Sequence, residues 1–413
     1  MDGFNGGAVV TARREASTLP AIAGGAPVRE SFLVYGRPQI EQAEIDEVVE
    51  TMRSGWIGAG PRTVRFAEAF GRYTGASHAL AVSSCTAALH LALVAVGIGP
   101  GDEVITTSMT FCATVNVILH CGATPVLVDC DPRTMNIDLE QVRARITSRT
   151  RAVIVVHFAG RACAMGPLLE LAAAHGLRVI EDCAHAIETL YEGRHAGTLG
   201  DVGAFSFYAT KNLCTGEGGM VLTADADIAE RVRCFAMSGM SRDAWKRYGS
   251  QGFRHYAVEA PGFKYNMTDL QAAFGIHQLA RVERNWERRR ELWHVYDGAL
   301  RGLPCFTPPP AEPNTRHALH MYNLLLDLDR LRVSRDDILD AMTAENVGVG
   351  VHYLPVHQQP YYRETFGYRD EQFPHASWIA ARTLSLPLAT SMSDDDQVSV
   401  VAAISRVLEY YAR

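Results

Sequence analysis

Short apolar segments alternate with amphipathic ones along the chain after Gly75. The apolar segments have the length of strands, and such strands are typical of a sheet that is buried on both faces. The segments between them have the spacing of helices. We predict strands at 79–82, 103–107, 125–129, 152–157, 179–182 and 204–208, and helices at 86–96, 111–121 and 168–175. This alternation predicts an α/β fold with a mostly parallel sheet and helices on both faces.

The rest of the chain divides around this pattern. Residues 1–30 lack periodicity and are predicted to form a loosely ordered extension, which leaves a large domain over 31–295. A helix is expected at 40–53, and a long amphipathic segment at 269–296 is expected to lead out of the large domain. Pro308-Pro-Pro then marks a boundary within a smaller C-terminal α/β domain, 296–413. Strands are predicted there at 321–326 and 347–352.

Composition narrows the function classes. The chain has 413 residues, 47% of them hydrophobic, which is enough for a large core. A net charge of −7 without a Lys/Arg-rich run argues against nucleic acid or an anionic membrane as a partner. Nothing approaches 18 uninterrupted apolar residues, and no apolar segment follows Arg13-Arg14 as in an export signal. The nine cysteines include no C-x-x-C pair, so we expect a cytoplasmic enzyme with reduced thiols and no metal site.

Polar residues gather where the predicted strands end. Parallel sheets place their ligands at the carboxyl ends of the strands. The residues at or just past such ends are Ser83, Thr107, Asp129, His157 and Asp182. Lys211 follows the strand at 204–208. A lysine that forms a Schiff base and a carboxylate that keeps the pyridine nitrogen protonated are what pyridoxal phosphate chemistry needs from a protein. The alternatives are a solvated lysine and an aspartate that caps the next helix.

Further side chains could complete such a site. Ser83-Ser-Cys85-Thr86 joins a strand to a helix and predicts a phosphate cradle, or alternatively a plain helix cap. Phe111 could stack on a flat heterocycle or simply pack in the core. His185 could lie near the ring or its 3′ oxygen, and the hydroxyl of Ser206 can reach a phosphate. The glycines of 216–219 let the backbone fold tightly beside a ligand.

The motifs together resemble the DegT/DnrJ/EryC1/StrS family of sugar aminotransferases, from about residue 33 to the C-terminus. The matching segments are 83–90, 97–104, 122–126, 181–185, 205–213, 216–219, 265–273 and 350–353. The resemblance implies an aspartate-aminotransferase-like fold of type I. It implies pyridoxal phosphate as the cofactor and a homodimer with shared active sites.

Residue roles follow from the resemblance position by position. It implies Lys211 as the Schiff-base lysine and proton carrier and Asp182 on the pyridinium nitrogen. Thr86 and Ser206 would hold the phosphate, and Phe111 would stack on the ring.

Some positions depart from the family pattern. His185 stands where many members have Gln, and Cys85 replaces the usual glycine of the cradle. The run 264–269 corresponds to a loop that reaches the partner's phosphate, and either Lys264 or Asn266 would make that contact. The segment 351–362 resembles a sugar-contacting segment.

Four side chains are candidates for substrate binding. His352, Tyr353 and His357 lie in the sugar-contacting segment, with packing of a Pro-punctuated loop as the alternative. Trp56 is placed near the mouth of the site on the same basis.

The leading hypothesis is an aminotransferase that moves an amino group from an amino acid, L-glutamate, to C4 of a nucleotide-linked keto-deoxysugar. The wording of residues 211–219 resembles members that aminate C4, in antibiotic and other deoxysugar pathways. One alternative is amination of a cyclitol such as scyllo-inosose, which the wording of residues 23–29 suggests. Another is a non-enzymatic regulator on the same fold. A sugar dehydratase is disfavoured because those relatives carry His in place of Lys211. A nicotinamide oxidoreductase is disfavoured because no G-x-G-x-x-G follows a strand.

Overall fold

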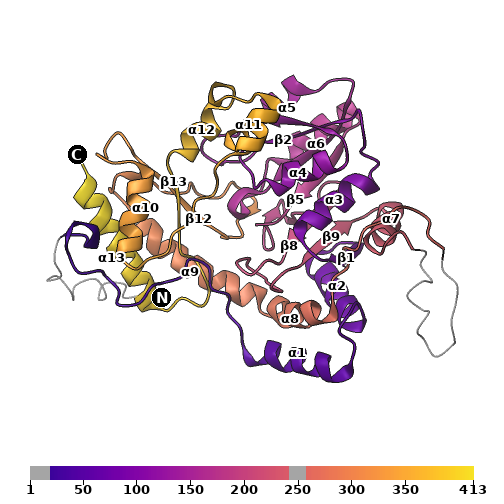
Figure 1. Ribbon diagram of the computed structural model, residues 1–413, viewed down its shortest axis with the longest axis horizontal. Coiled ribbons are helices and arrows are strands. Elements are labelled where there is room, and N and C mark those ends of the chain that lie inside the picture. Colours follow the sequence, from indigo (N-terminus) through magenta and orange to yellow (C-terminus); the bar gives the residue numbers. More distant parts are fainter. Residues whose placement is uncertain (1–18, 241–256) are drawn as a thin grey trace, which may run out of the picture.

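The computed structural model describes residues 19–240 and 257–413, and its centre is a seven-stranded sheet (Figure 1). The strand order is β1-β9-β8-β5-β4-β2-β3. The strands are β1 (His78–Val82), β2 (Glu103–Thr107), β3 (Thr124–Val128), β4 (Thr150–Val156), β5 (Arg178–Asp182), β8 (Val202–Ser206) and β9 (Gly219–Thr223). β9 is antiparallel to both of its neighbours, and the other pairings are parallel. The predicted mostly parallel α/β sheet is confirmed.

Successive residues of each strand face opposite layers of helices. Val104, Ile154 and Ile180 pack with α3 (Cys85–Ala95), α4 (Ala113–His120) and α7 (Ala226–Ala236). Ile105 and Val153 pack on the other face with α5 (Leu139–Arg145) and α6 (Met165–His175). On that same face Phe205 of β8 packs with α2 (Pro61–Thr74) and α8 (Asp269–Ala280). Burial on both faces is why the sequence of these strands is continuously apolar.

The long amphipathic segment predicted at 269–296 is two helices, α8 and α9 (Val282–Ala299), which break at Arg281. Arg281 leaves helical geometry at φ −115° and forms a buried ion pair with Glu44 of α1 (Gln42–Ser54). Beyond the break, α9 runs on toward the C-terminal part of the chain (Figure 1).

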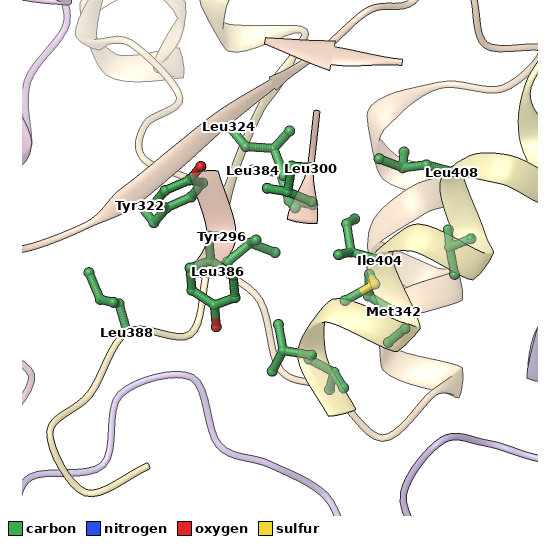
Figure 2. Close-up of a cluster of buried hydrophobic side chains, with 14 of the residues drawn as sticks. Tyr296, Leu300, Tyr322, Leu324, Met342, Leu384, Leu386, Leu388, Ile404 and Leu408 are labelled. Atoms are coloured by element: carbon green, nitrogen blue, oxygen red, sulfur yellow. The ribbon is translucent and has the colours of Figure 1, made fainter. Parts of the chain in front are cut away.

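The C-terminal part builds its own core on a second sheet. This sheet has the order β10 (Cys305–Phe306), β12 (Tyr322–Leu326), β13 (Thr383–Leu386). α9, α10 (Arg335–Ala344) and α13 (Asp394–Tyr411) pack on it, with Tyr296, Tyr322 and Ile404 among the buried side chains (Figure 2). The predicted strand at 321–326 is confirmed. The one predicted at 347–352 is wrong, because that segment makes only isolated bridges from Val347 and Gly350.

Shorter elements complete the described chain. They are η1 (Ala21–Ala23), η2 (Phe158–Gly160), β6 (Leu190–Tyr191), β7 (Arg194–His195), β11 (Thr315–Arg316), η4 (Val356–Gln358), α11 (Pro360–Phe366), η5 (Asp370–Gln372) and α12 (Pro374–Ala380). β11 pairs with β6, and this pairing connects the C-terminal part of the chain to the part that contains the large sheet. Within the described ranges, no helix is long and apolar enough to cross a membrane.

Part of the predicted N-terminal extension is tied to the C-terminal core. The carboxylate of Glu345, which is fully buried, accepts hydrogen bonds from the backbone N–H of Ala21 and of Val28 at 2.8 and 2.9 Å. Arg406 of α13 pairs with the same carboxylate. Residues 21–28 therefore have fixed partners, which differs from the loose extension predicted for 1–30, and residues 1–18 lie outside the described chain. The domain boundary at 295/296 stays a prediction.

Replacing Glu345 with Ala should lower the free energy of unfolding by about 3–5 kcal/mol, because Arg406 and two backbone N–H groups lose their buried partner. Chemical denaturation measures this loss. Glu409→Ala, at an exposed position of α13, is the control and should change stability by less than about 0.5 kcal/mol. Equal stability of the two variants would contradict the anchoring role of Glu345.

Candidate active site

Lys211 lies just beyond β8 and lines a cavity of about 50 Å³ between the large sheet and the C-terminal part. The same cavity is lined by Tyr35, Arg289, His320 and His352. Desolvation lowers the pKa of Lys211 to about 8, although Cys85 and Asp182 oppose this shift. The amine is therefore far easier to deprotonate than an ordinary lysine, whose pKa is about 10.4.

Asp182 ends β5 on the same side of the sheet and is 5% exposed. One carboxylate oxygen accepts from the backbone N–H of Ala184 at 3.1 Å, and the other accepts from the hydroxyl of Thr114 at 2.8 Å. The thiol of Cys85 lies 3.9 Å from the first oxygen. Burial raises the pKa of the Asp182 carboxyl, so a cation placed against it would stabilise the ionised form.

The side chain of Glu181, the residue before Asp182, points to the opposite face of β5, because successive side chains of a strand alternate between faces. There it holds the strand in place. Its carboxylate accepts from the backbone N–H groups of Gly197, Leu199 and Gly200 at 2.7–2.8 Å. It also lies 3.0 Å from Nε2 of His157. Since His157 Nδ1 accepts from Cys163 N–H, Nε2 carries the proton and donates to Glu181. Sequence analysis placed His157 at a strand end without finding this partner.

The segment after β1 has the geometry of a phosphate cradle. Ser84 caps α3, and its hydroxyl accepts from the backbone N–H of Ala87 at 3.0 Å. The first two helical N–H groups, of Cys85 and Thr86, have no acceptor among the described residues. A Cβ at Gly219 would lie 2.5 Å from Ser84 backbone atoms, so only glycine allows this approach.

Ser206, at the end of β8, is buried, and its hydroxyl accepts from Tyr208 N–H at 3.3 Å.

Three residues that were predicted to contact the cofactor ring or the sugar lie together beside the cavity: His185, Tyr353 and Phe111. His185 is buried, and its Nδ1 accepts from Ala159 N–H at 3.2 Å. Its Nε2 therefore donates to the Tyr353 hydroxyl at 2.9 Å. Burial, followed by the charge of Lys211, holds the pKa of His185 well below 6.5. Phe111 precedes α4 rather than opening it, is 57% exposed, and has its ring centroid 6.0 Å from that of Tyr353.

Of the other substrate-binding candidates, one lines the cavity and the others lie outside it. His352 lines the cavity, its Nδ1 lies 2.8 Å from the Ser385 hydroxyl, and burial lowers its pKa to about 4. His357 is fully buried, with Nε2 3.0 Å from the Ser377 hydroxyl and its ring stacked on Phe373. Its geometry favours the packing alternative over contact with a substrate.

Trp56 is 54% exposed and follows α1, and it is not among the residues that line the cavity.

The run 264–266 crosses the end of β1. Asn266 forms a backbone bridge with Val82, and Ser83 N–H donates to Tyr265 O at 2.7 Å. Lys264 is exposed, whereas the Asn266 side chain donates to Met267 O at 3.2 Å. This run therefore lies beside the cradle of its own chain. Arg242, Arg247 and Arg254, whose charge would suit an anionic substrate, lie outside the described residues.

Three further buried residues of this region were not predicted from the sequence: Glu188, Asn212 and His320. His320 stacks on His185 with ring centroids 4.8 Å apart. Asn212 directly follows Lys211 in sequence, which was the only signal available for the group.

The comparisons with known proteins agree with this geometry. Residues 38–405 match the DegT/DnrJ/EryC1/StrS aminotransferase family, to which the chain belongs. The spore coat polysaccharide biosynthesis protein SpsC of Bacillus subtilis is 49% identical over 382 residues, which is 92% of this chain and 98% of SpsC.

Solved structures of sugar aminotransferases share the fold. The putative sugar aminotransferase Spr1654 from Streptococcus pneumoniae, in its PMP form, superposes with a TM-score of 0.85 at 29% identity, over 92% of this chain and 98% of that one. DesI, solved in the presence of its TDP-sugar product, has a TM-score of 0.83 at 32% identity, over 95% of this chain and 97% of that one. The protein is a pyridoxal-phosphate-dependent sugar aminotransferase.

The residues present fit this cofactor. Two free helix N–H groups suit its phosphate, the buried Asp182 suits a protonated ring nitrogen, and Lys211 presents an amine of lowered pKa.

The amine of Lys211 should react with an acylating reagent in cofactor-free protein with a midpoint at about pH 8. Its pKa is lowered, so the reactive neutral form is lost only as pH falls through that value. The chain has three lysines, Lys211, Lys246 and Lys264, so peptide mass spectrometry can follow each one. Nα-acetyl-lysine is the reference, with an ordinary pKa of about 10.4. A Lys211 midpoint above pH 10 would contradict the desolvated amine.

Proposed function

We propose that this member of the family transfers the amino group of L-glutamate to the C4 keto group of a nucleotide-linked keto-deoxysugar. The observation that carries the proposal is a lysine of lowered pKa that faces a buried, hydrogen-bonded aspartate at the carboxyl edge of the sheet. The TDP-sugar product named for DesI supports the substrate class. The homodimer, the cytoplasmic location and the absence of a metal belong to the same proposal.

The two central residues divide the chemistry. Pyridoxal phosphate supplies the electron sink when it is bound. Asp182 keeps the ring nitrogen protonated, and the hydrogen bonds from Ala184 and Thr114 hold its carboxylate in place. Lys211 binds the cofactor and then, as a free amine, carries the proton to and from the substrate carbon. A pKa of about 8 suits both tasks near neutral pH.

Other side chains orient the bound groups. Cys85, Thr86 and Ser206 would hold the phosphate at the start of α3, and Phe111 would stack on the ring. His185 donates to Tyr353 and thereby ties the C-terminal part of the chain to the segment after β5. His352 and Tyr353 face the sugar.

Replacing Asp182 with Asn should reduce kcat by 100-fold or more and leave cofactor binding largely intact, because a neutral amide cannot hold the ring nitrogen protonated. Steady-state kinetics and cofactor titration measure the two effects. Asp129→Asn is the control, since this buried aspartate follows β3 and accepts from the backbone N–H of His375 and of Ala376 outside the site. It should lower stability and leave kcat within threefold. Lys211→Ala sets the inactive baseline, and an active Lys211→Ala would refute the proposed lysine.

The substrate class separates the proposal from the cyclitol alternative. A diphosphate needs cationic or multiple donor groups near the mouth of the cavity, and Lys264 and His352 are candidates. We expect faster amination of a dTDP- or UDP-4-keto-6-deoxyhexose with glutamate than of scyllo-inosose with glutamine. Parallel assays that follow the amino product by mass spectrometry test this. Faster conversion of the cyclitol would overturn the substrate assignment and leave the cofactor assignment standing.

The homodimer can be tested by subunit complementation. We propose that Lys264, which is exposed, or Asn266 reaches the phosphate of the partner's cofactor. Lys264→Ala and Lys211→Ala subunits, each poorly active alone, should regain about a quarter of wild-type activity after mixed refolding, because half of the sites in half of the dimers become intact. If Lys264 served its own chain, mixing would restore nothing, and Asn266→Ala would be tested the same way.

A further inference from the structure

A buried chain of hydrogen bonds runs from Glu188 through Asn212 to His320, and no step proposed above uses it. All three residues are at least 90% buried. Asn212 Nδ2 donates to Glu188 Oε2 and to the backbone oxygen of Ala318, both at 2.8 Å. Asn212 Oδ1 lies 2.9 Å from Nδ1 of His320. The chain ends at the imidazole that stacks on His185.

The donors and acceptors of this chain fix the tautomer of His320. A backbone oxygen can only accept, so the NH₂ group of Asn212 must face Ala318. Its carbonyl oxygen must then face His320, and an acceptor there requires a proton on Nδ1. In a neutral imidazole the proton on Nδ1 leaves a lone pair on Nε2. No described group hydrogen-bonds to that nitrogen.

The surroundings keep this imidazole neutral. Burial holds the pKa of His320 well below 6.5, and the neighbouring Lys211, His185, Arg289 and His352 lower it further. The backbone beside the ring is held in place, because the backbone N–H of His320 donates to Ala159 O at 3.1 Å and Arg289 donates to both Leu388 O and His320 O. The ring itself is positioned by Asn212 and by its stacking on His185. His320 thus presents a fixed, uncharged acceptor at the wall of the cavity that Lys211 also lines.

An amine is the group that suits this acceptor. The cavity wall otherwise offers many donors, among them the guanidinium of Arg289, the amide of Asn285 and the Lys211 amine itself. An amine that donates one N–H to Nε2 has its lone pair turned in a defined direction. Orientation of a nucleophile in this way lowers the entropic part of the barrier.

Resting on the proposed function, we infer that His320 is a further catalytic residue, whose Nε2 accepts a hydrogen bond from a reacting amine, either Lys211 or the amino group of the donor. Asn212 and Glu188 act through it as positioning residues. A purely structural chain would tie the segment after β8 to the residues before β12 and make no use of Nε2.

The tautomer can be observed directly. In 15N-histidine-labelled holoenzyme, two-bond 1H–15N spectra should show His320 with a protonated Nδ1 and a bare Nε2, unchanged from pH 6 to pH 9. His320→Asn identifies the signal by its loss. A protonated Nε2 or an imidazolium at pH 7.5 would overturn the inference. This readout does not depend on the substrate, so it remains decisive if glutamate is not the donor.

Rates then separate catalysis from structure. His320→Asn keeps a donor toward Asn212 and removes the Nε2 acceptor. It should slow the single-turnover reaction with glutamate at least tenfold, while cofactor affinity stays within threefold. His317→Asn is the control, because His317 is equally buried and bonds Leu319 N–H without lining the cavity. A His320→Asn rate within twofold of wild type would refute the role.

Asn212→Leu tests the positioning residues. This variant keeps the imidazole of His320 but removes the Asn212 carbonyl that holds the proton on Nδ1. A protonated Nε2 should therefore appear in the spectrum, and the rate should fall as in His320→Asn. An unchanged tautomer in Asn212→Leu would overturn the relay.

The two candidate amines are distinguished in cofactor-free protein. Loss of an acceptor for the Lys211 ammonium would lower the pH midpoint of Lys211 acylation in His320→Asn. An unchanged midpoint, with a slowed reaction with glutamate, assigns Nε2 to the amino group of the donor.

Discussion

The site depends on the removal of one amine from water. In the proposed reaction Lys211 loses its proton near neutral pH, yet the charge of Asp182 favours the protonated form. Desolvation outweighs this attraction and brings the pKa to about 8. The large sheet alone cannot provide that desolvation, because the cavity is closed by α9 and by residues 320–321 and 352–353 of the C-terminal part. Asn285 and Arg289 place α9 in the cavity wall, so this helix contributes to the proposed chemistry as well as to the fold.

The alternation of a β-strand serves two functions at the end of β5. Asp182 lies on one face of the strand, where its carboxylate accepts from Ala184 and Thr114, and Glu181 points to the turn at 197–200 on the other face. The buried Glu181 carboxylate, with three backbone N–H donors and a histidine, fixes the backbone that carries Asp182. The Asp182 carboxylate is then held by the hydrogen bonds from Ala184 and Thr114 and by the contact with the Cys85 thiol.

Sequence periodicity was enough to predict the strands of the large sheet, because these strands are buried on both faces and their connections are short. It failed where tertiary contacts decide the backbone. The segment 347–352 has the composition of a strand, but its residues pair with two different parts of the chain. Val347 pairs with Leu33 and Gly350 pairs with Ser385, so only isolated bridges form. The helical period also runs unbroken through Arg281, whose ion pair with a residue more than 200 positions away ends α8.

The site residues divide in the same way. Lys211, Asp182 and the cradle at 84–86 stand in short motifs that follow strands, so the sequence alone predicts them as site residues. Glu188, Asn212 and His320 are spread over more than 130 positions, and only the fold brings them together. For His357 the motif left substrate contact and packing open, and its burial against Phe373 favours packing.

The use of lysine and arginine along the chain is related to the desolvation of Lys211. Of 39 lysines and arginines only three are lysine, and the ion pairs among the described residues use arginine or histidine. Arginine suits fixed, bidentate pairs because it stays charged, but for that reason it cannot supply a free amine. Position 211 requires a group that gives up its proton when desolvated, and lysine is the cationic side chain that does so. The exposed Lys264 suits the phosphate contact proposed for it, because lysine binds a phosphate as a compact point charge.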